Sequence, residues 1–154
     1  LVETGVARGK KKLLFFSKIN WKDGMSTLIF SDYAKHINGN LTTCDISFKN
    51  IENAKKFTKK NKKFINFVVD DSVNFLSKFN KQIDFLYLDS LDGQYEGSSK
   101  HQLEEIKVAF KHLNKNSLVL LDDKGAKTNL SINYMLKNNL KILNETNEQV
   151  LLSY

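Results

Sequence analysis

Short apolar segments of strand length alternate with helical segments along almost the whole chain. The runs "NLTTCDIS" and "IDFLYLDS" have the length and apolar content of buried strands, whereas "FKNIENAKKFTKKN" repeats apolar residues with a helical period. Near the C-terminus, "LKILNET" and "EQVLLSY" indicate a strand pair around a short turn. This alternation predicts an α/β three-layer sandwich around a mainly parallel, seven-stranded sheet, with one antiparallel strand near the C-terminus.

The spacing of apolar residues also predicts which side of two helices faces the sheet. In the segment "GMSTLIFSDYAKHI" the apolar positions with a helical period are Leu28, Ile29, Tyr33 and Ile37. We expect these residues to face inward and Ser26 to cap the helix. The next helix is expected to face inward through Ile51, Ala54 and either Phe57 or Thr58.

The size and composition of the chain favour one packed domain. Because it has 154 residues, 41% of them hydrophobic, we expect residues 1–154 to form a single domain. The first residues already have the pattern of a buried strand, so we expect natural sequence to precede them. No apolar run is long enough to span a membrane, and the single Cys44 cannot form an internal disulfide. We therefore expect a cytoplasmic protein with no membrane partner, in which Cys44 is a buried thiol.

The net charge of +7 raises the question of a nucleic-acid partner. Arg8 is the only arginine among the 24 basic residues, although arginine is the residue that binds phosphate in a bidentate manner. The lysine run "KKFTKKNKK" fits the solvated side of a helix. The charge therefore makes nucleic acid a less favoured partner without excluding it.

Acidic side chains end five of the expected strands. They are Glu3, Asp45, Asp70 with Asp71, Asp89, and Asp122 with Asp123. A single terminal Asp is often a turn former or a helix cap. Several at one edge of a parallel sheet would repel one another unless a ligand or a cation uses them. Ligands bind at this edge in open α/β sheets, so the pattern predicts a binding site there.

Together these segments resemble the class I S-adenosylmethionine-dependent methyltransferases, and among them the small-molecule O-methyltransferase-like group. In "VETGVARG", Glu3, Gly5 and Gly9 match the acid and the glycines of the family's first motif, while Ala7 departs from it. The resemblance covers essentially the whole chain and implies a Rossmann-like fold with S-adenosylmethionine as cofactor. It implies that Glu3, Gly5 and Gly9 contact the cofactor and that Asp45, at the end of the second strand, binds its ribose hydroxyls.

Other cofactor contacts follow from the same resemblance. It implies that Asp71 and Ser72 lie by the adenine, and that Ile46 and Asp89 also contact the cofactor. The acceptor is expected to be a small molecule.

The segment between the glycine turn and the first helix is longer than the family's usual turn. Residues 10–25 include Trp21 and several apolar residues, which suggest either an extra helix packed on the domain or a lid over the site. The amides at the start of the following helix, with Gly24 and Ser26 as contacts, are then expected to face the methionine carboxylate of the cofactor.

Methyl transfer needs positioning and a base that unmasks the acceptor. The candidate bases are Asp89, Asp122, Asp92 and Asp123, with His101 as a further catalytic candidate. In cation-dependent members of the family, acids at these strand ends bind a divalent ion. The resemblance therefore implies an Mg²⁺ site formed by Asp89, Asp122 and Asp123.

The function expected from the sequence is transfer of a methyl group from S-adenosylmethionine to an acceptor hydroxyl of a small molecule, such as a sugar or a natural product, with or without a metal. Three other hypotheses remain open: an RNA methyltransferase, a degenerate nucleotide-binding domain, and a polyamine synthase of the same fold. Binding to RNA that weakens steeply with salt would favour the first of these.

Overall fold

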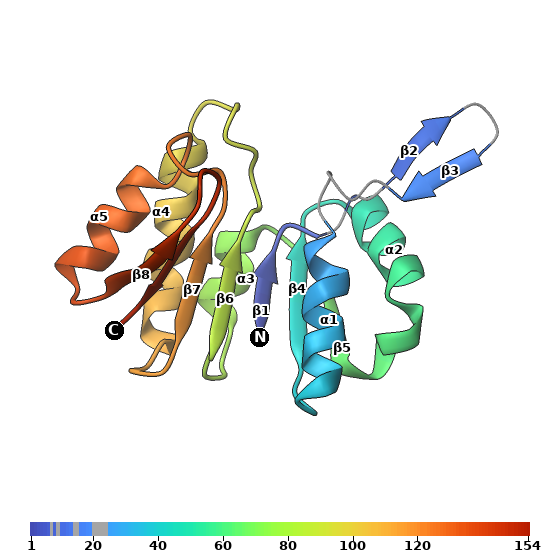
Figure 1. Cartoon of the computed structure of the whole chain (residues 1–154), viewed down its shortest axis with the longest axis horizontal. Coiled ribbons are helices and arrows are strands. Elements are labelled where there is room, and N and C mark those ends of the chain that lie inside the picture. Colours follow the sequence, from blue (N-terminus) through green and yellow to red (C-terminus); the bar gives the residue numbers. More distant parts are fainter. Residues whose placement is uncertain (7, 9, 14–15, 20–24) are drawn as a thin grey trace.

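The computed structural model describes residues 1–6, 8, 10–13, 16–19 and 25–154 of the chain. Its centre is a seven-stranded sheet with the strand order β5-β4-β1-β6-β7-β9-β8 (Figure 1). The strands are β1 (Val2–Thr4), β4 (Leu41–Asp45), β5 (Ile65–Val69), β6 (Phe85–Leu88), β7 (Leu118–Leu121), β8 (Lys141–Glu145) and β9 (Val150–Ser153). The first five of these pair in parallel, and β9 runs antiparallel to both of its neighbours. The predicted sheet, including its one antiparallel strand, is confirmed.

Helices cover the sheet in two groups. They are α1 (Ser26–His36), α2 (Phe48–Phe57), α3 (Ser72–Lys78), α4 (Ser98–Ala109) and α5 (Asn129–Lys137), with short 3₁₀ helices η1 (Lys59–Phe64) and η2 (Phe110–His112). Helices α3, α4 and α5 pack in series against one side of the sheet, and α1 and α2 lie together on the other (Figure 1). This is the arrangement that right-handed crossovers impose on a sheet whose strand order reverses beside its first strand.

The main hydrophobic core lies between the sheet and the α3–α5 layer. It includes Leu86, Leu88, Val119 and Ile106, all with no exposed surface. Cys44 belongs to this core and is fully buried, as predicted, and burial raises the pKa of its thiol to about 12. On the α1–α2 side, the described residues form a small apolar cluster, in which Ile51 and Ala54 of α2 are buried as expected.

The predicted inner side of α1 was wrong. Ile29 and Tyr33 are 58% and 52% exposed, and Ile37 lies just past the helix and is also exposed. The buried residues of α1 are instead the small Thr27, Ser31 and Ala34. Small side chains let the helix lie close to polar groups of the sheet. These contacts, and not the spacing of the apolar residues, decide which side of α1 faces the sheet.

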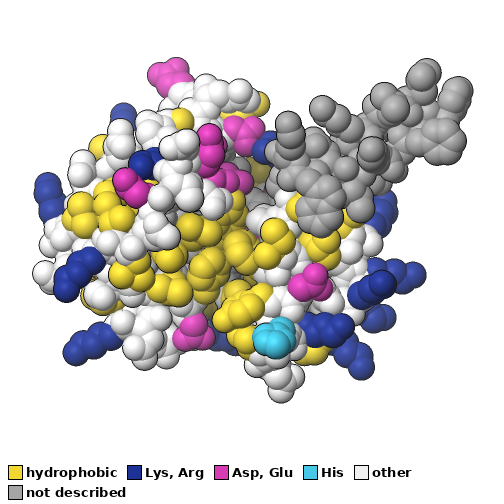
Figure 2. Space-filling view, viewed as in Figure 1, with side chains coloured by type: hydrophobic (Ala, Val, Ile, Leu, Met, Phe, Trp, Pro, Cys, Tyr) yellow, Lys and Arg dark blue, Asp and Glu magenta, His cyan; other side chains and the backbone are white. Residues whose placement is uncertain are grey.

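Hydrophobic side chains gather over the middle of this face of the molecule (Figure 2).

Two further predictions near α1 need correction. Met25, not Ser26, is the N-cap residue of α1, and no side chain caps the helix. The extra helix expected within residues 10–25 is replaced by an antiparallel hairpin of β2 (Lys10–Leu13) and β3 (Phe16–Ile19). Trp21 and Gly24 fall outside the residues that the structure describes, so the lid hypothesis remains a prediction.

Within the described part of the chain, no helix has both the length and the apolar character needed to cross a bilayer.

Candidate functional site

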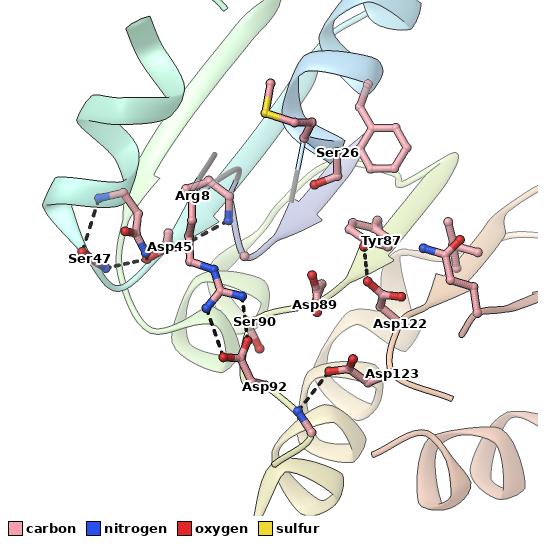
Figure 3. A pocket seen from close by; sticks show the side chains of 18 of the residues that line it. Arg8, Ser26, Asp45, Ser47, Tyr87, Asp89, Ser90, Asp92, Asp122 and Asp123 are labelled. Atoms are coloured by element: carbon pink, nitrogen blue, oxygen red, sulfur yellow. Dashed lines mark hydrogen bonds and ion pairs between the residues drawn. The ribbon is translucent and has the colours of Figure 1, made fainter. Parts of the chain in front are cut away.

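The carboxyl ends of the central strands open into a cavity of about 790 Å³ (Figure 3). Among the described residues, its acidic lining comes from the ends of three strands: Asp45 at the end of β4, Asp89 and Asp92 after β6, and Asp122 and Asp123 after β7. Val6, Ile29, Phe30 and Leu120 supply apolar surface. The structure therefore brings most of the predicted strand-end acids to one site.

The turn after β1 passes very close to the end of β6. Gly5 has φ +82°, and its N–H donates to the carbonyl oxygen of Cys44 at 2.8 Å. A Cβ atom on Gly5 would overlap the carbonyl oxygen of Asp89 and lie 2.7 Å from its carbonyl carbon. Only glycine combines this backbone conformation with this approach. Gly9, the second predicted glycine contact, falls outside the described residues.

Asp45 ties the glycine turn to the start of α2. Its carboxylate accepts hydrogen bonds from the N–H of Val6 at 3.2 Å and of Ser47 at 2.7 Å, and both of its oxygens contact the side-chain amide of Asn50. The next residue, Ile46, is 75% exposed at the cavity edge. These hydrogen bonds fix the orientation of the Asp45 side chain at the wall of the cavity, beside an apolar surface.

A second, smaller cavity of about 190 Å³ adjoins the first and shares Gly5, Asp45 and Ile46 with it. Asp71, Ser72 and His101 also line it. His101 Nε2 lies 2.9 Å from Ser72 Oγ, and Asp71 caps α3 by accepting a hydrogen bond from the N–H of Asn74.

The two cavities separate the predicted catalytic residues. His101 lines the smaller cavity, whereas Asp89 and Asp122 line the larger one. The structure therefore groups His101 with the residues predicted to lie by the adenine. Ser26, at the first turn of α1, lines the larger cavity.

Glu3, which the resemblance predicts as a cofactor contact, instead lies beneath the site and lines neither cavity. Its side chain is fully buried, and its Oε2 accepts hydrogen bonds from the hydroxyls of Thr27 at 2.8 Å and Thr43 at 2.6 Å. Glu3 thus joins β1 to α1 and β4. Burial raises the pKa of this carboxyl to about 7, and its hydroxyl partners only partly oppose the shift.

The raised pKa of Glu3 predicts a pH-dependent stability. The folded protein keeps the proton up to about pH 7, whereas the unfolded chain releases it near 4.5. The folded state therefore binds more protons in this window, and stability falls as the pH rises through it, by about 3 kcal/mol from this group. In urea unfolding between about pH 5 and about pH 8, Glu3→Gln should remove this part of the slope. An unchanged slope in the variant would contradict the assignment.

A buried lysine joins two of the acids at the strand ends. Lys127 Nζ lies 2.9 Å from Asp89 Oδ1 and 3.0 Å from Asp123 Oδ2, and its side chain is only 2% exposed. Burial alone would lower the pKa of Lys127, but the two carboxylates outweigh it and raise that pKa. Burial raises the pKa of Asp89 to about 6, against the opposing effect of Lys127.

Sequence reasoning missed Lys127. It follows the strand-end acids in "DDKGAK", where a lysine looks like any other surface lysine of this basic chain. A signal was nonetheless present, because a lysine four residues after Asp123 is within reach of that acid in any helical turn.

The third acid, Asp122, is paired with Tyr87. The Tyr87 hydroxyl donates to Asp122 Oδ2 at 2.6 Å (Figure 3). Burial, with the nearby carboxylates, raises the pKa of Tyr87, so the phenol stays protonated. Asp122 therefore faces the cavity as a carboxylate that a neutral donor orients.

The predicted Mg²⁺ ligands fit a metal poorly. Asp89 and Asp123 share the Lys127 ammonium, Asp123 Oδ2 also accepts from the N–H of Gly93, and Asp122 accepts from Tyr87. Among the residues described, no group of three Asp, Glu, His or Cys side chains is arranged to hold a metal ion.

Arg8 and Asp92 bridge the cavity between the turn after β1 and the loop after β6. The guanidinium makes a bidentate pair with the carboxylate, with distances of 3.0 and 2.9 Å (Figure 3). Asp92, a candidate base from the sequence, is therefore engaged with a cation.

Comparison with known proteins identifies the family. The sequence profile of a methyltransferase domain matches residues 21–124, about two thirds of the chain. The chain belongs to this methyltransferase family. It is an S-adenosylmethionine-dependent enzyme of the class I fold, as predicted. A search of curated proteins gives no match.

Solved structures of other methyltransferases share the fold of this methyltransferase. Podospora anserina PaMTH1, solved with S-adenosylhomocysteine, has 13% identity and a TM-score of 0.68 over 99% of this chain and 70% of its own. An rRNA methylase from Streptococcus thermophilus has 12% identity and a TM-score of 0.65, over 99% and 84%. A ribosomal protein L11 methylase from Lactobacillus delbrueckii has 16% identity and a TM-score of 0.62, over 99% and 69%. These neighbours differ in acceptor, so the fold alone does not identify the acceptor of this methyltransferase.

Proposed function

We propose that this methyltransferase, formed by residues 1–154 as one domain, transfers a methyl group from S-adenosylmethionine to a hydroxyl group of a small molecule. The observation that carries the proposal is the pair of adjoining cavities with Gly5, Asp45 and Ile46 on their shared wall. The smaller cavity suits the nucleoside part of the cofactor, and the larger cavity has room for the methionine part and an acceptor.

The proposed cofactor pose follows the lining residues. The adenine lies in the smaller cavity against Ile46, near Asp71 and Ser72, and the ribose hydroxyls donate to Asp45. An anion with oriented oxygens is suited to a vicinal diol. The methionine part then passes over the Gly5 turn toward Ser26 and Asp89, where a carboxylate can accept hydrogen bonds from the cofactor amine.

The acceptor is proposed to lie against Phe30, Tyr87 and Leu120, with Asp122 as its base. The acceptor oxygen attacks the methyl carbon, the bond from that carbon to sulfur breaks, and Asp122 takes the hydroxyl proton. S-adenosylhomocysteine and the methyl ether are the products. Positioning supplies most of the rate in such an in-line displacement. We propose that His101, which lines the smaller cavity, contacts the cofactor and not the acceptor.

A small molecule fits the site better than RNA does. Five carboxylates of the described residues line the larger cavity, and carboxylates repel the phosphates of a nucleic acid. The lysines that make the chain basic include those of α2 and η1, which are mostly exposed. RNA remains the second candidate because of the net charge of +7.

Calorimetric titration with S-adenosylmethionine and S-adenosylhomocysteine tests the cofactor part of the proposal. We expect dissociation constants on the order of micromolar for both. A folded protein that binds neither would favour the degenerate nucleotide-binding domain.

An acceptor screen tests the rest. Release of S-adenosylhomocysteine is measured with hydroxylated small molecules and, separately, with RNA at low salt. Turnover of RNA but of no small molecule would overturn the choice of acceptor and leave the cofactor assignment intact.

A further inference from the structure

The Lys127 ammonium has all of its donors in use. Besides Asp89 and Asp123, its Nζ donates to the carbonyl oxygen of Leu91 at 2.9 Å. A lysine ammonium has three N–H groups, so these three acceptors satisfy it completely. The side chain is 2% exposed, which removes water as a competing partner.

The chain after β7 is shaped to place this lysine. Asp123 has φ +57° and Gly125 has φ +83°, two left-handed residues that reverse the backbone. The N–H groups of Ala126 and Lys127 both donate to the carbonyl oxygen of Asp123 at 3.1 Å. A left-handed conformation at a non-glycine residue costs free energy, so this turn is maintained by the contacts that it creates.

We propose that Lys127 is the resident cation of this site and takes the place of a divalent metal, so that the native protein binds none at Asp89, Asp122 and Asp123. A metal would have to displace an ammonium that two carboxylates and a carbonyl already hold. It would also remain beside a positive charge, because Lys127 is attached to the chain and cannot leave as a free ion does.

The same arrangement makes Lys127 a positioning residue. It holds Asp89 at the cavity wall through one carboxylate oxygen, Oδ1. It also draws Asp123 toward the loop after β6, where the N–H of Gly93 donates to Oδ2 of Asp123 at 3.0 Å. The inference does not depend on which molecule is methylated.

Binding of Mn²⁺, followed by loss of the electron paramagnetic resonance signal of the free ion, tests the proposal on the purified chain. The wild-type protein is expected to bind no Mn²⁺ at this site at submillimolar concentrations. Lys127→Met leaves the carboxylates without their cation, and its affinity for Mn²⁺ should rise about tenfold or more. Adding Asp89→Asn to this variant should abolish the gain.

Two matched controls separate charge from shape. Lys127→Arg keeps the positive charge and should bind no Mn²⁺. Lys107→Met removes an exposed lysine that pairs with Glu104 on α4, and it should behave as the wild type. If Lys127→Met does not fold, Lys127→Gln, which keeps a hydrogen-bond donor, replaces it.

Two results would overturn the proposal. One is micromolar Mn²⁺ binding by the wild-type protein that Asp89→Asn removes, since the lysine would then coexist with a metal. The other is a folded neutral variant at position 127, shown by circular dichroism and cooperative melting, that gains no affinity for Mn²⁺. Both readouts are independent of cofactor binding, so they stand apart from a failure of the proposed function.

Discussion

Replacing Gly5 with alanine is expected to lower the free energy of unfolding by about 4 kcal/mol or more, or to prevent folding. The new Cβ would overlap the carbonyl of Asp89, whose backbone belongs to the neighbouring strand end and cannot rotate away. The left-handed φ of +82° adds its own penalty of about 1 kcal/mol. Urea unfolding, followed by circular dichroism, measures the change.

Gly97→Ala is the matched control for this prediction. Gly97 has φ +84°, almost the same as Gly5, but a Cβ there would meet no atom within 4 Å. Its substitution should therefore cost only about 1 kcal/mol, the backbone penalty alone. Equal losses in the two variants would show that the close approach of β1 and β6 is not what requires glycine.

Substituting Asp45 with alanine is expected to weaken S-adenosylmethionine binding by roughly 30- to 1000-fold, or about 2–4 kcal/mol. In the proposed pose the variant loses the acceptor of the ribose hydroxyls. It also leaves the N–H groups of Val6 and Ser47 without their carboxylate, so the glycine turn and the start of α2 lose their link. Calorimetric titration with S-adenosylmethionine measures the effect.

Two further variants make the Asp45 result specific. Asp45→Asn keeps an acceptor oxygen but loses the charge, and it should fall between the alanine variant and the wild type. Glu52→Ala removes a partly exposed acid of α2 that forms an ion pair with Lys55, and it should bind as the wild type. Unchanged affinity in a folded Asp45→Ala protein would place the cofactor elsewhere.

Much of the fold was predictable because burial imposes short-range patterns. Central parallel strands are covered on both sides, so "IDFLYLDS" forms an apolar run that the sequence reveals directly. The inner side of α1 was not predictable in this way. It packs on the buried carboxyl of Glu3 through Thr27, so polar and small residues face inward and the apolar Ile29 and Tyr33 face out.

The acidic residues of the candidate site could be predicted from the sequence, but the buried cation, Lys127, could not. The parallel sheet brings the carboxyl ends of its strands to one edge, so Asp45, Asp89 and Asp122 could be grouped from the order of the strands. His101 could not be assigned to the smaller cavity, because its position depends on how α4 packs beside α3.

The amino-acid sequence by itself determined the order of the central-sheet strands and their connecting helices, the acidic edge of the sheet and the glycine turn, because these depend on burial periods and on backbone conformations that few residues adopt. Only the tertiary structure decided that Glu3 lies beneath the cavities and that Lys127 joins Asp89 to Asp123. The physical reason is that the environment of an ionisable side chain is set by groups distant in sequence. Asp89 and Lys127 are 38 residues apart, and only the folded chain brings them within 2.9 Å.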